Sequence, residues 1–162
     1  MRKRKPFDTA SLQPESETCF ICEFIRGNSR YAHFEVARTG HAVAFMNKYP
    51  TLEGYVLVAP LDHLEQVTGD MSAAGYLELQ ALVYCVAEAV RKVMEPERVY
   101  ILSLGSQSAN THIHWHIAPL PHGVPLEEQQ YHALMHEHGA LEVADAELAD
   151  LARRIGSTIT TD

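Results

Sequence analysis

The sequence predicts an α+β domain in which an antiparallel sheet packs against one long helix and shorter flanking helices. Three observations predict this fold class. Residues 112–118 alternate histidine with apolar residues, which is the period of a strand. Residues 73–94 repeat apolar residues at spacings of three and four, which is the period of an amphipathic helix. A second extended segment, 98–104, reaches the histidine segment through one polar loop, so we expect the two to pair as antiparallel neighbours.

The bulk properties of the chain predict one globular domain. A chain of 162 residues can bury its own core, and we expect a flexible N-terminal extension over 1–16 and the domain over 17–162, ending in a polar segment and a short helix. The basic start lacks the apolar middle of a signal peptide, and no stretch approaches the roughly 20 apolar residues of a membrane span. A net charge of -8 argues against nucleic-acid or membrane-surface binding. The three cysteines make no disulfide framework, so we expect a cytoplasmic protein.

The first ordered element is a short helix. Residues 20–25 carry apolar side chains that fit one or two helical turns, and Gly27 ends them. Two strands follow at 30–37 and 41–46, with a turn at residues 39–40 between them. The second strand is the stronger prediction of the two, because its apolar run is denser.

The middle of the chain predicts a buried strand and the long helix. Residues 54–59 are almost continuously apolar between a glycine and a proline, which is typical of a central strand covered on both faces. The loop at 60–64 contains a histidine. Ser72 can cap the helix at 73–94, and Pro96 ends it.

The last third returns the chain to the sheet. The polar loop 105–110 joins the strand at 98–104 to the histidine strand. Beyond Pro119 the sequence is polar and rich in histidine without clear periodicity. We expect His132, His136 and His138 on the surface, and the alternative is that they form part of a lid over the site. A final helix is predicted over about 144–155, with Gly156 at its end.

The histidine segment is the strongest candidate for a functional site. Successive side chains of a strand point to opposite faces, so His112, His114 and His116 should line one face while the apolar residues between them reach the core. The alternatives are a half-exposed strand with incidental histidines and an adventitious metal site. Three histidines at strict period two favour a functional face.

Phosphoryl chemistry suits such a face. Neutral imidazole is a nucleophile, a base and a metal ligand, and rings about 7 Å apart along a strand can reach one phosphate together. The central His114 can attack phosphorus and form a phosphoramidate that water then cleaves. The loop 105–110 can supply hydrogen-bond donors for phosphate oxygens, and the alternative is that it is a plain polar turn. Those donors are Ser106, Gln107, Ser108 and Asn110.

The run from His112 to Ala118 resembles the motif of the histidine triad (HIT) nucleotide-binding superfamily, which reads His, apolar, His, apolar, His, apolar, apolar. The resemblance extends from about Cys19 to Pro119. It includes a Cys-x-x-Cys turn, the segments 44–50 and 54–59, a Pro-x-x-His turn at 60–63 and the long helix.

This resemblance implies a small α+β homodimer that hydrolyses or transfers at the α-phosphate of a purine nucleotide or dinucleotide. By motif position His114 is the nucleophile, His116 assists the leaving group and His112 orients the site, and the chemistry itself needs no metal. The resemblance places the base and ribose on Phe20, Ile21, Phe24, Phe45 and Asn47. Asn47 followed by Lys48 is similar to the dinucleoside-polyphosphate branch, whereas nucleoside phosphoramidates are the other substrate class.

Two positions depart from the family pattern. The loop residues Gln107, Ser108 and Asn110 are one residue out of step with the usual spacing, so they stay candidates for nucleotide binding without individual roles. Pro119 is followed by Leu120 where the family often has arginine, which leaves the leaving-group preference open.

A structural zinc site is predicted from Cys19 and Cys22, whose spacing supplies half of a tetrahedral site. The two missing ligands are expected to be His63 and His112, an arrangement similar to that of Cys-x-x-Cys members of the family. Free cysteines and a redox pair are the alternatives, and no thioredoxin-like pattern favours the second. For the whole protein, the alternatives to an enzyme are a nucleotide-binding regulatory protein with weak or no catalysis and a purely structural metal module.

Overall fold

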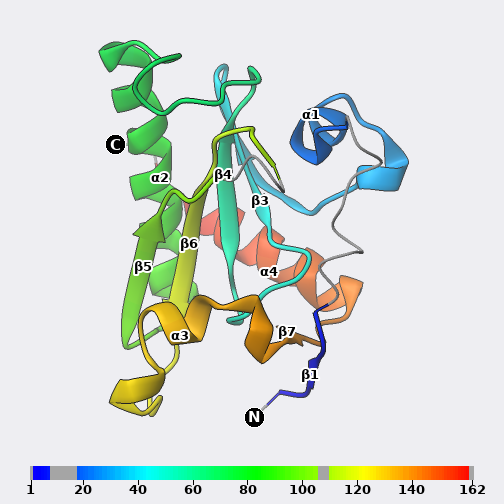
Figure 1. Ribbon diagram of the computed structural model, residues 1–162, viewed down its shortest axis with the longest axis vertical. Helices are drawn as coiled ribbons and strands as arrows, with labels where there is room; N and C mark the ends of the chain where they lie inside the picture. Colours follow the sequence, from blue (N-terminus) through cyan, green and yellow to red (C-terminus); the bar gives the residue numbers. More distant parts are fainter. Residues whose placement is uncertain (1, 8–17, 106–109, 161–162) are drawn as a thin grey trace.

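A five-stranded antiparallel sheet in the order β2-β3-β4-β6-β5 forms the centre of the molecule, which confirms the α+β prediction (Figure 1). A computed structural model describes residues 2–7, 18–105 and 110–160. The elements of the sheet are β2 (Glu35–Arg38), β3 (Ala42–Met46), β4 (Val56–Pro60), β5 (Arg98–Leu102) and β6 (Trp115–Leu120). The helices are α1 (Phe20–Ile25), η2 (Ser29–Tyr31), α2 (Ala73–Met94), η3 (Leu126–Glu128), α3 (Tyr131–Leu134), η4 (His136–His138) and α4 (Asp145–Thr158), and a two-stranded sheet is made of β1 (Arg4–Lys5) and β7 (Ala140–Leu141).

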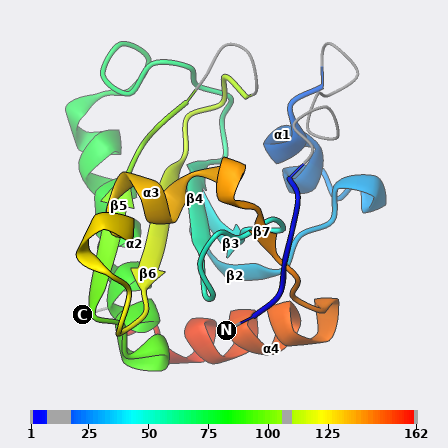
Figure 2. The ribbon, with the colours of Figure 1, turned by 60° about the horizontal axis from the view of Figure 1, so that its bottom comes forward.

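The helices α2 and α4 cover one face of the sheet (Figures 1 and 2). As predicted, α2 spans residues 73–94, and the Ser72 hydroxyl accepts a hydrogen bond from the Gly75 amide at its start. Its apolar stripe packs on Val58, Trp115 and neighbouring strand residues in one core cluster. By length and hydropathy alone α2 could cross a membrane, a test that the core helix of a globular domain also passes.

The helix α4 continues beyond the glycine that was expected to end it. It runs to Thr158, and Gly156 lies inside it against β2. A Cβ at this position would come within 2.5 Å of the Val36 carbonyl oxygen. The glycine therefore allows close packing of helix and strand rather than marking a stop.

Two predicted strands differ from the observed ones. The weak strand over 30–37 is a 3-10 turn followed by the four-residue β2. The histidine strand starts at Trp115 rather than at residue 112, because its first ladder pair joins Trp115 to Val58. Before that point the chain follows the loop after β4 instead, and the Ile113 amide donates to the Leu64 carbonyl at 2.8 Å.

The other face of the sheet is covered by α1 and by residues 122–141. Ile21 of α1 and Phe45, Leu57 and Ala118 of the strands share a second core cluster, which includes Leu134 from the C-terminal part of the chain. Since successive strand residues alternate between faces, His116 lies on this face, between the helix-facing Trp115 and Ile117.

Part of the predicted flexible extension is ordered. Arg4 and Lys5 form β1, which pairs antiparallel with β7. The Arg4 guanidinium donates to the carbonyls of Gly139 and Thr51 at 2.8 and 2.9 Å. The basic residues near the N-terminus thus find acceptors in the domain, which the composition of the segment did not indicate. Residues 8–17 lie outside the described part of the chain.

Candidate active site and metal centre

His114 presents a neutral imidazole whose orientation is fixed by backbone. It lies immediately before β6 and is 8% exposed. Its Nδ1 is 2.8 Å from the carbonyl oxygen of His112, so Nδ1 carries the proton and donates it, which leaves the lone pair on Nε2 free. Burial lowers the pKa of His114, so the ring is neutral at pH 7. The Ser103 hydroxyl donates to the His114 carbonyl at 2.9 Å and holds the backbone in place. A ring in this state can act as a nucleophile.

His116 lies beside His114 and holds the other neutral tautomer, with its proton on Nε2. The two ring centroids are 4.7 Å apart. The Tyr55 hydroxyl lies 3.0 Å from Nδ1 of His116, and burial raises the pKa of Tyr55, so this hydroxyl keeps its proton and donates to Nδ1. The imidazole proton is then on Nε2, which is buried and makes no hydrogen bond of good geometry among the described residues, with the Leu104 carbonyl as its nearby acceptor. This N–H can turn to a ligand that offers a better acceptor.

The pKa of His116 is lowered to about 3. Burial is the main cause, followed by the charges of His114 and His136, while the Leu104 carbonyl acts in the opposite direction. His116 therefore remains a neutral hydrogen-bond donor at physiological pH.

His112 faces a different group of residues from the other two histidines. Its side chain is fully buried, and its Nδ1 lies 3.4 Å from Cys19 Sγ and 3.5 Å from Cys22 Sγ. Its ring contacts that of His63, whereas the rings of His114 and His116 contact each other. The prediction that all three histidines line one strand face is therefore wrong: β6 begins at Trp115, after His112 and His114, and only His114 keeps its ring beside that of His116 while the ring of His112 turns to the cysteines.

The four predicted metal ligands lie together. One ligand atom from each of Cys19, Cys22, His63 and His112 falls within 4.8 Å of the others, so the group can hold a metal ion. Cys22 Sγ lies 3.3 Å from His63 Nδ1. Tetrahedral zinc with ordinary Zn–S and Zn–N bonds requires S···N separations of about 3.5 Å, which this cluster matches.

The surroundings of the cluster also suit a metal. Both histidines offer Nδ1 to the centre, and their Nε2 atoms point to acceptors, the Pro60 carbonyl at 3.0 Å and the Glu65 carboxylate at 3.3 Å. Metal-bound histidines commonly donate their second N–H in this way. Burial raises the pKa of Cys22 to about 12, so a bound cation would displace the thiol proton.

An aromatic cluster extends from His116 toward the edge of the sheet. Phe45 pairs with Leu57 across β3 and β4, and Leu57 pairs with His116, so all three share a face. The rings of Phe24 and Phe45 have centroids 4.9 Å apart, and Phe20 packs edge-on to Phe45. The structure thus brings three of the predicted base-binding residues together on the histidine face.

His33 belongs to this cluster, although the sequence analysis missed it. Its ring lies 5.1 to 5.5 Å from those of Phe20, Phe24 and Phe45. Burial lowers its pKa, so it behaves as a fourth aromatic ring. A single histidine in a weakly patterned segment carries no signal that could have identified it.

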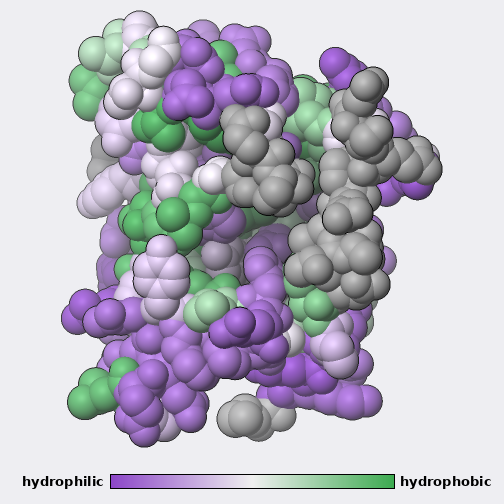
Figure 3. Space-filling model, viewed as in Figure 1, coloured by the Kyte–Doolittle hydropathy of each residue, from purple (hydrophilic) through white to green (hydrophobic). Residues whose placement is uncertain are grey.

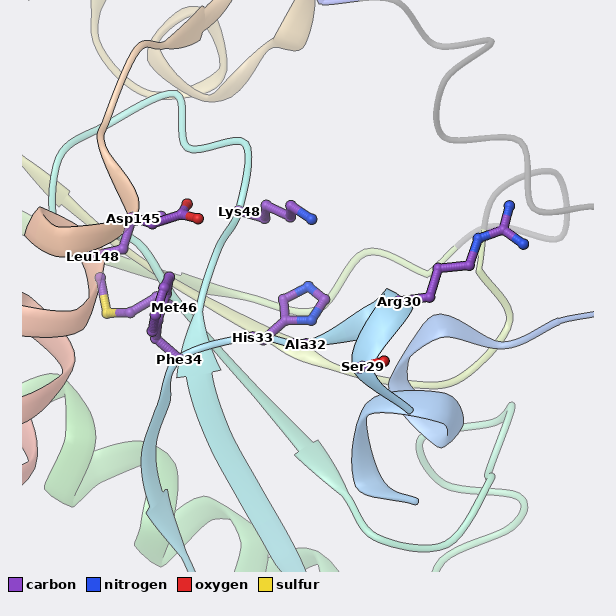
Figure 4. A pocket seen from close by; sticks show the side chains of 9 residues that line it. All are labelled: Ser29, Arg30, Ala32, His33, Phe34, Met46, Lys48, Asp145 and Leu148. Carbon is purple, nitrogen blue, oxygen red and sulfur yellow. The ribbon is translucent and has the colours of Figure 1, made fainter. Parts of the chain in front are cut away.

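A cavity of about 230 Å³ borders the aromatic cluster through His33. Figure 4 shows the Lys48 side chain running over the His33 ring, with Asp145 on the opposite side of Lys48. The cavity gives the aromatic cluster an opening that contains charged groups. It is lined by Ser29, Arg30, Ala32, His33, Phe34, Met46, Lys48, Asp145 and Leu148.

The remaining predicted binding residues are placed less uniformly. Ile21 is fully buried in the core. Asn47 Oδ1 accepts from the Tyr49 amide at 2.9 Å, so only its NH₂ group is available. Asn110 has a buried Nδ2 with no partner among the described residues, as expected for a donor that awaits a ligand. Gln107 and Ser108 lie outside the described residues.

Acidification below about pH 6.5 is expected to destabilise the fold through His116. Its pKa is about 3 in the folded chain and about 6.5 when unfolded, so between these values the unfolded state binds the extra proton. The stability that this neutral histidine contributes is complete above pH 6.5 and is lost at about 1.4 kcal/mol per pH unit as the pH falls. Urea unfolding midpoints near pH 7.5 and pH 5.5 should differ less for His116→Asn than for the wild type. Equal pH dependence in both proteins would contradict this assignment.

Two curated proteins are similar in sequence to this chain. The chain is 28% identical over 109 residues to an adenosine 5'-monophosphoramidase of Schizosaccharomyces pombe, covering 64% of this chain and 75% of that protein. It is 26% identical over 110 residues to an uncharacterized HIT-like protein of Mycoplasma genitalium, covering 64% and 74%.

The solved structures that resemble the chain share its fold. A hypothetical histidine triad nucleotide-binding protein of Sulfolobus tokodaii superposes with a TM-score of 0.70 at 22% identity, covering 87% of this chain and 91% of that one. A zinc-bound histidine triad family protein of Mycobacterium smegmatis gives 0.68 at 17%, covering 86% and 94%. The profile of the HIT domain matches residues 30–123, which is more than half of the sequence. The chain belongs to the HIT domain family.

Proposed function

We propose that the protein is a nucleotide hydrolase or transferase that acts at an α-phosphate through a covalent nucleotidyl-His114 intermediate. The observation that carries the proposal is the pair of buried neutral imidazoles, in which His114 offers a lone pair at Nε2 and His116 offers an N–H beside it. A HIT relative named as an adenosine monophosphoramidase supports this class of chemistry.

In the first step, Nε2 of His114 forms a bond to phosphorus while the bond from phosphorus to the leaving group breaks. The His116 N–H donates a hydrogen bond to the departing atom or a phosphate oxygen. A nucleotide departs as an anion, and an amine departs from a phosphoramidate already protonated on nitrogen. Water then attacks phosphorus, the P–N bond breaks, and a mononucleotide and a proton are released while His114 returns to its neutral form.

The substrate proposal is a purine nucleotide joined to an amine or to a second nucleotide. The base would pack among Phe20, Phe24 and Phe45, with Ile21 behind them in the core, because aromatic faces stack well on purines. The NH₂ group of Asn47 would serve the ribose. The unpaired Asn110 amide would donate to a phosphate oxygen, and Gln107 and Ser108 stay candidates for the same role.

A substrate panel tests the proposal. Purified protein is incubated with adenylyl and guanylyl phosphoramidates and with dinucleoside polyphosphates, and mononucleotide release is followed by chromatography. We expect release from at least one adenylyl substrate. Tight mononucleotide binding without release from any substrate would instead indicate the nucleotide-binding regulatory protein.

We further propose that the metal site holds structural zinc. The Cys₂His₂ ligand set and the zinc-bound neighbour of Mycobacterium smegmatis support this choice. All four coordination positions would be filled by protein, so the metal has no open position for substrate. Its role would be to fix α1 and the ring of His112 near His114.

We also propose that the protein is a cytoplasmic homodimer that binds neither nucleic acid nor membranes. β5 is an edge strand of the sheet, and Ile101 on it shares the α2 side of the sheet with its partner Ile117. Ile101 is 50% exposed, and Tyr84 on α2 is 68% exposed. Figure 3 shows hydrophobic side chains gathered on the same side of the molecule as β5 and α2. Covering this face with a second copy would bury these residues and the open edge.

Substituting this face is expected to produce monomers. A double variant, Tyr84→Asp and Ile101→Asp, places charges on the exposed apolar residues, so the mass from light scattering should fall by about half. Leu126→Asp is the matched control, because Leu126 is 84% exposed and belongs to η3 rather than to α2 or β5. A wild-type protein that is monomeric at micromolar concentration would refute the dimer.

A further inference from the structure

The segment that follows the HIT match folds back over the face that carries His116. The match ends at residue 123, and Val124, Ala133 and Leu134 pack against the core on that face. The amide of Gln130 donates to the Tyr100 hydroxyl at 3.0 Å. This part of the chain therefore builds one wall of the site from residues that the family match does not include.

The N-terminal residues hold the end of this segment in place. β1 runs alongside β7, as Figure 2 shows. Gly139 has φ +84, and a Cβ there would come within 2.7 Å of the Lys5 carbonyl oxygen, so the two backbones are in close contact. The Leu141 amide also donates to the Pro50 carbonyl at 2.8 Å, which ties β7 to the loop after β3.

His136 is the half-buried histidine of this segment. The late histidines are expected on the surface, and His132 and His138 are exposed, but His136 is not. Its ring stacks on Phe7 with centroids 4.3 Å apart and planes at 24°, and Phe7 packs edge-on to Tyr49. The ring of His136 is thus held by Phe7, a residue more than 100 positions away in the sequence.

Packing connects His136 to the catalytic pair. Leu134, two residues before His136, packs against the core cluster that contains Leu57 and Tyr55. Leu57 pairs with His116 across β4 and β6, and the Tyr55 hydroxyl lies 3.0 Å from His116 Nδ1, so this segment lies over His116. In agreement with this placement, a positive charge on His136 would lower the pKa of His116.

His116 Nε2, which makes no hydrogen bond of good geometry within the described residues, belongs to the same face of the sheet. The ammonium of Lys5 lies 5.9 Å from the Tyr49 ring centroid. The wall beyond His116 therefore presents hydrogen-bond donors and a cation, which suit a phosphate group.

We propose that His136 is a specificity-determining residue that contacts the leaving group, and that it selects leaving groups containing phosphate over small amines. The inference rests on the proposed function, because a leaving group exists only if the α-phosphate is attacked. His114 and the aromatic cluster bind the nucleotidyl half, which both substrate classes share. His136, whose ring stacks on Phe7, contacts only the leaving group, which differs between the two substrate classes.

The test compares His136→Ala with wild type on two substrates. Diadenosine tetraphosphate carries a nucleotide leaving group, and adenosine phosphoramidate releases ammonia, which is too small to reach His136. We expect kcat/KM to fall about tenfold or more for the first and to change less than about twofold for the second. Phe7→Ala should reproduce part of the loss. His138→Ala is the matched control, since this exposed histidine belongs to the same short helix, η4.

A second readout keeps the test independent of turnover. Calorimetry should show weaker binding of diadenosine tetraphosphate to the His136→Ala variant of a His114→Ala background, with binding of adenosine monophosphate unchanged. Equal losses for both substrates and both ligands would show that His136 is only structural, and no loss for either would show that it makes no contact. Absence of turnover in the wild type would refute the proposed catalysis, whereas the binding comparison would still decide on His136.

Discussion

Replacing His114 with alanine is expected to reduce kcat by a factor on the order of 10⁴ or more while a mononucleotide still binds. His114 is the ring whose Nδ1 is held by a backbone carbonyl and whose Nε2 lone pair is free, so its loss removes the atom that would bond to phosphorus. The aromatic cluster and Asn110 remain in place, and they would carry the binding. Turnover is measured by mononucleotide release, and affinity by calorimetry with adenosine monophosphate.

The intermediate itself can be trapped. Rapid acid-free quenching of wild-type protein with substrate should add the mass of one mononucleotidyl group to the peptide that contains His114. His41→Ala provides a control, because the His41 side chain is 80% exposed on the turn before β3, and it should leave both kcat and the adduct unchanged. Full activity in the His114→Ala protein would end the nucleotidyl-histidine mechanism.

The periodic parts of the fold could be predicted from the sequence. The spacing in 73–94 marks one helical face, and that face packs on the sheet. Alternation after residue 114 places Trp115 and Ile117 against α2 and His116 on the other face. The cluster that could hold a metal was predictable because Cys-x-x-Cys is a local pattern and the resemblance supplied the two histidines.

The rest depends on contacts between distant segments. The alternation of histidine with apolar residues starts at His112, but β6 starts only at Trp115, because the Ile113 amide donates to the Leu64 carbonyl in the loop after β4 rather than to β4 itself. The ring of His33 packs on Phe45 and that of His136 stacks on Phe7, and no local pattern connects either histidine to its partner. The sequence pattern predicts that Gly156 ends the helix, whereas in the structure the absence of a Cβ lets α4 pack closely against the backbone of Val36.

Substitution of the predicted metal ligands is expected to have the second largest effect, a loss of folding stability. Metal analysis of purified protein should give close to one zinc per chain, and Cys19→Ser combined with Cys22→Ser should abolish it. We expect the double variant to lose at least about 3 kcal/mol of stability, because a helix as short as α1 does not form without tertiary support. The measurement is urea unfolding with and without a chelator. Cys85→Ser is the control, since Cys85 lies on α2 outside the cluster.

Loss of the metal should also reduce catalysis, because His112 connects the metal site directly to His114. The ring of His112 reaches the two cysteines, while its carbonyl accepts the Nδ1 proton of His114. A metal that fixes the ring therefore fixes the carbonyl that sets the tautomer of the nucleophile. Without it, His114 can turn its proton to Nε2, and the lone pair is no longer offered to phosphorus. Activity should fall in the chelated protein before the remainder of the fold unfolds. A Cys19→Ser protein that retains zinc, or a chelated protein with unchanged stability and turnover, would rule the site out.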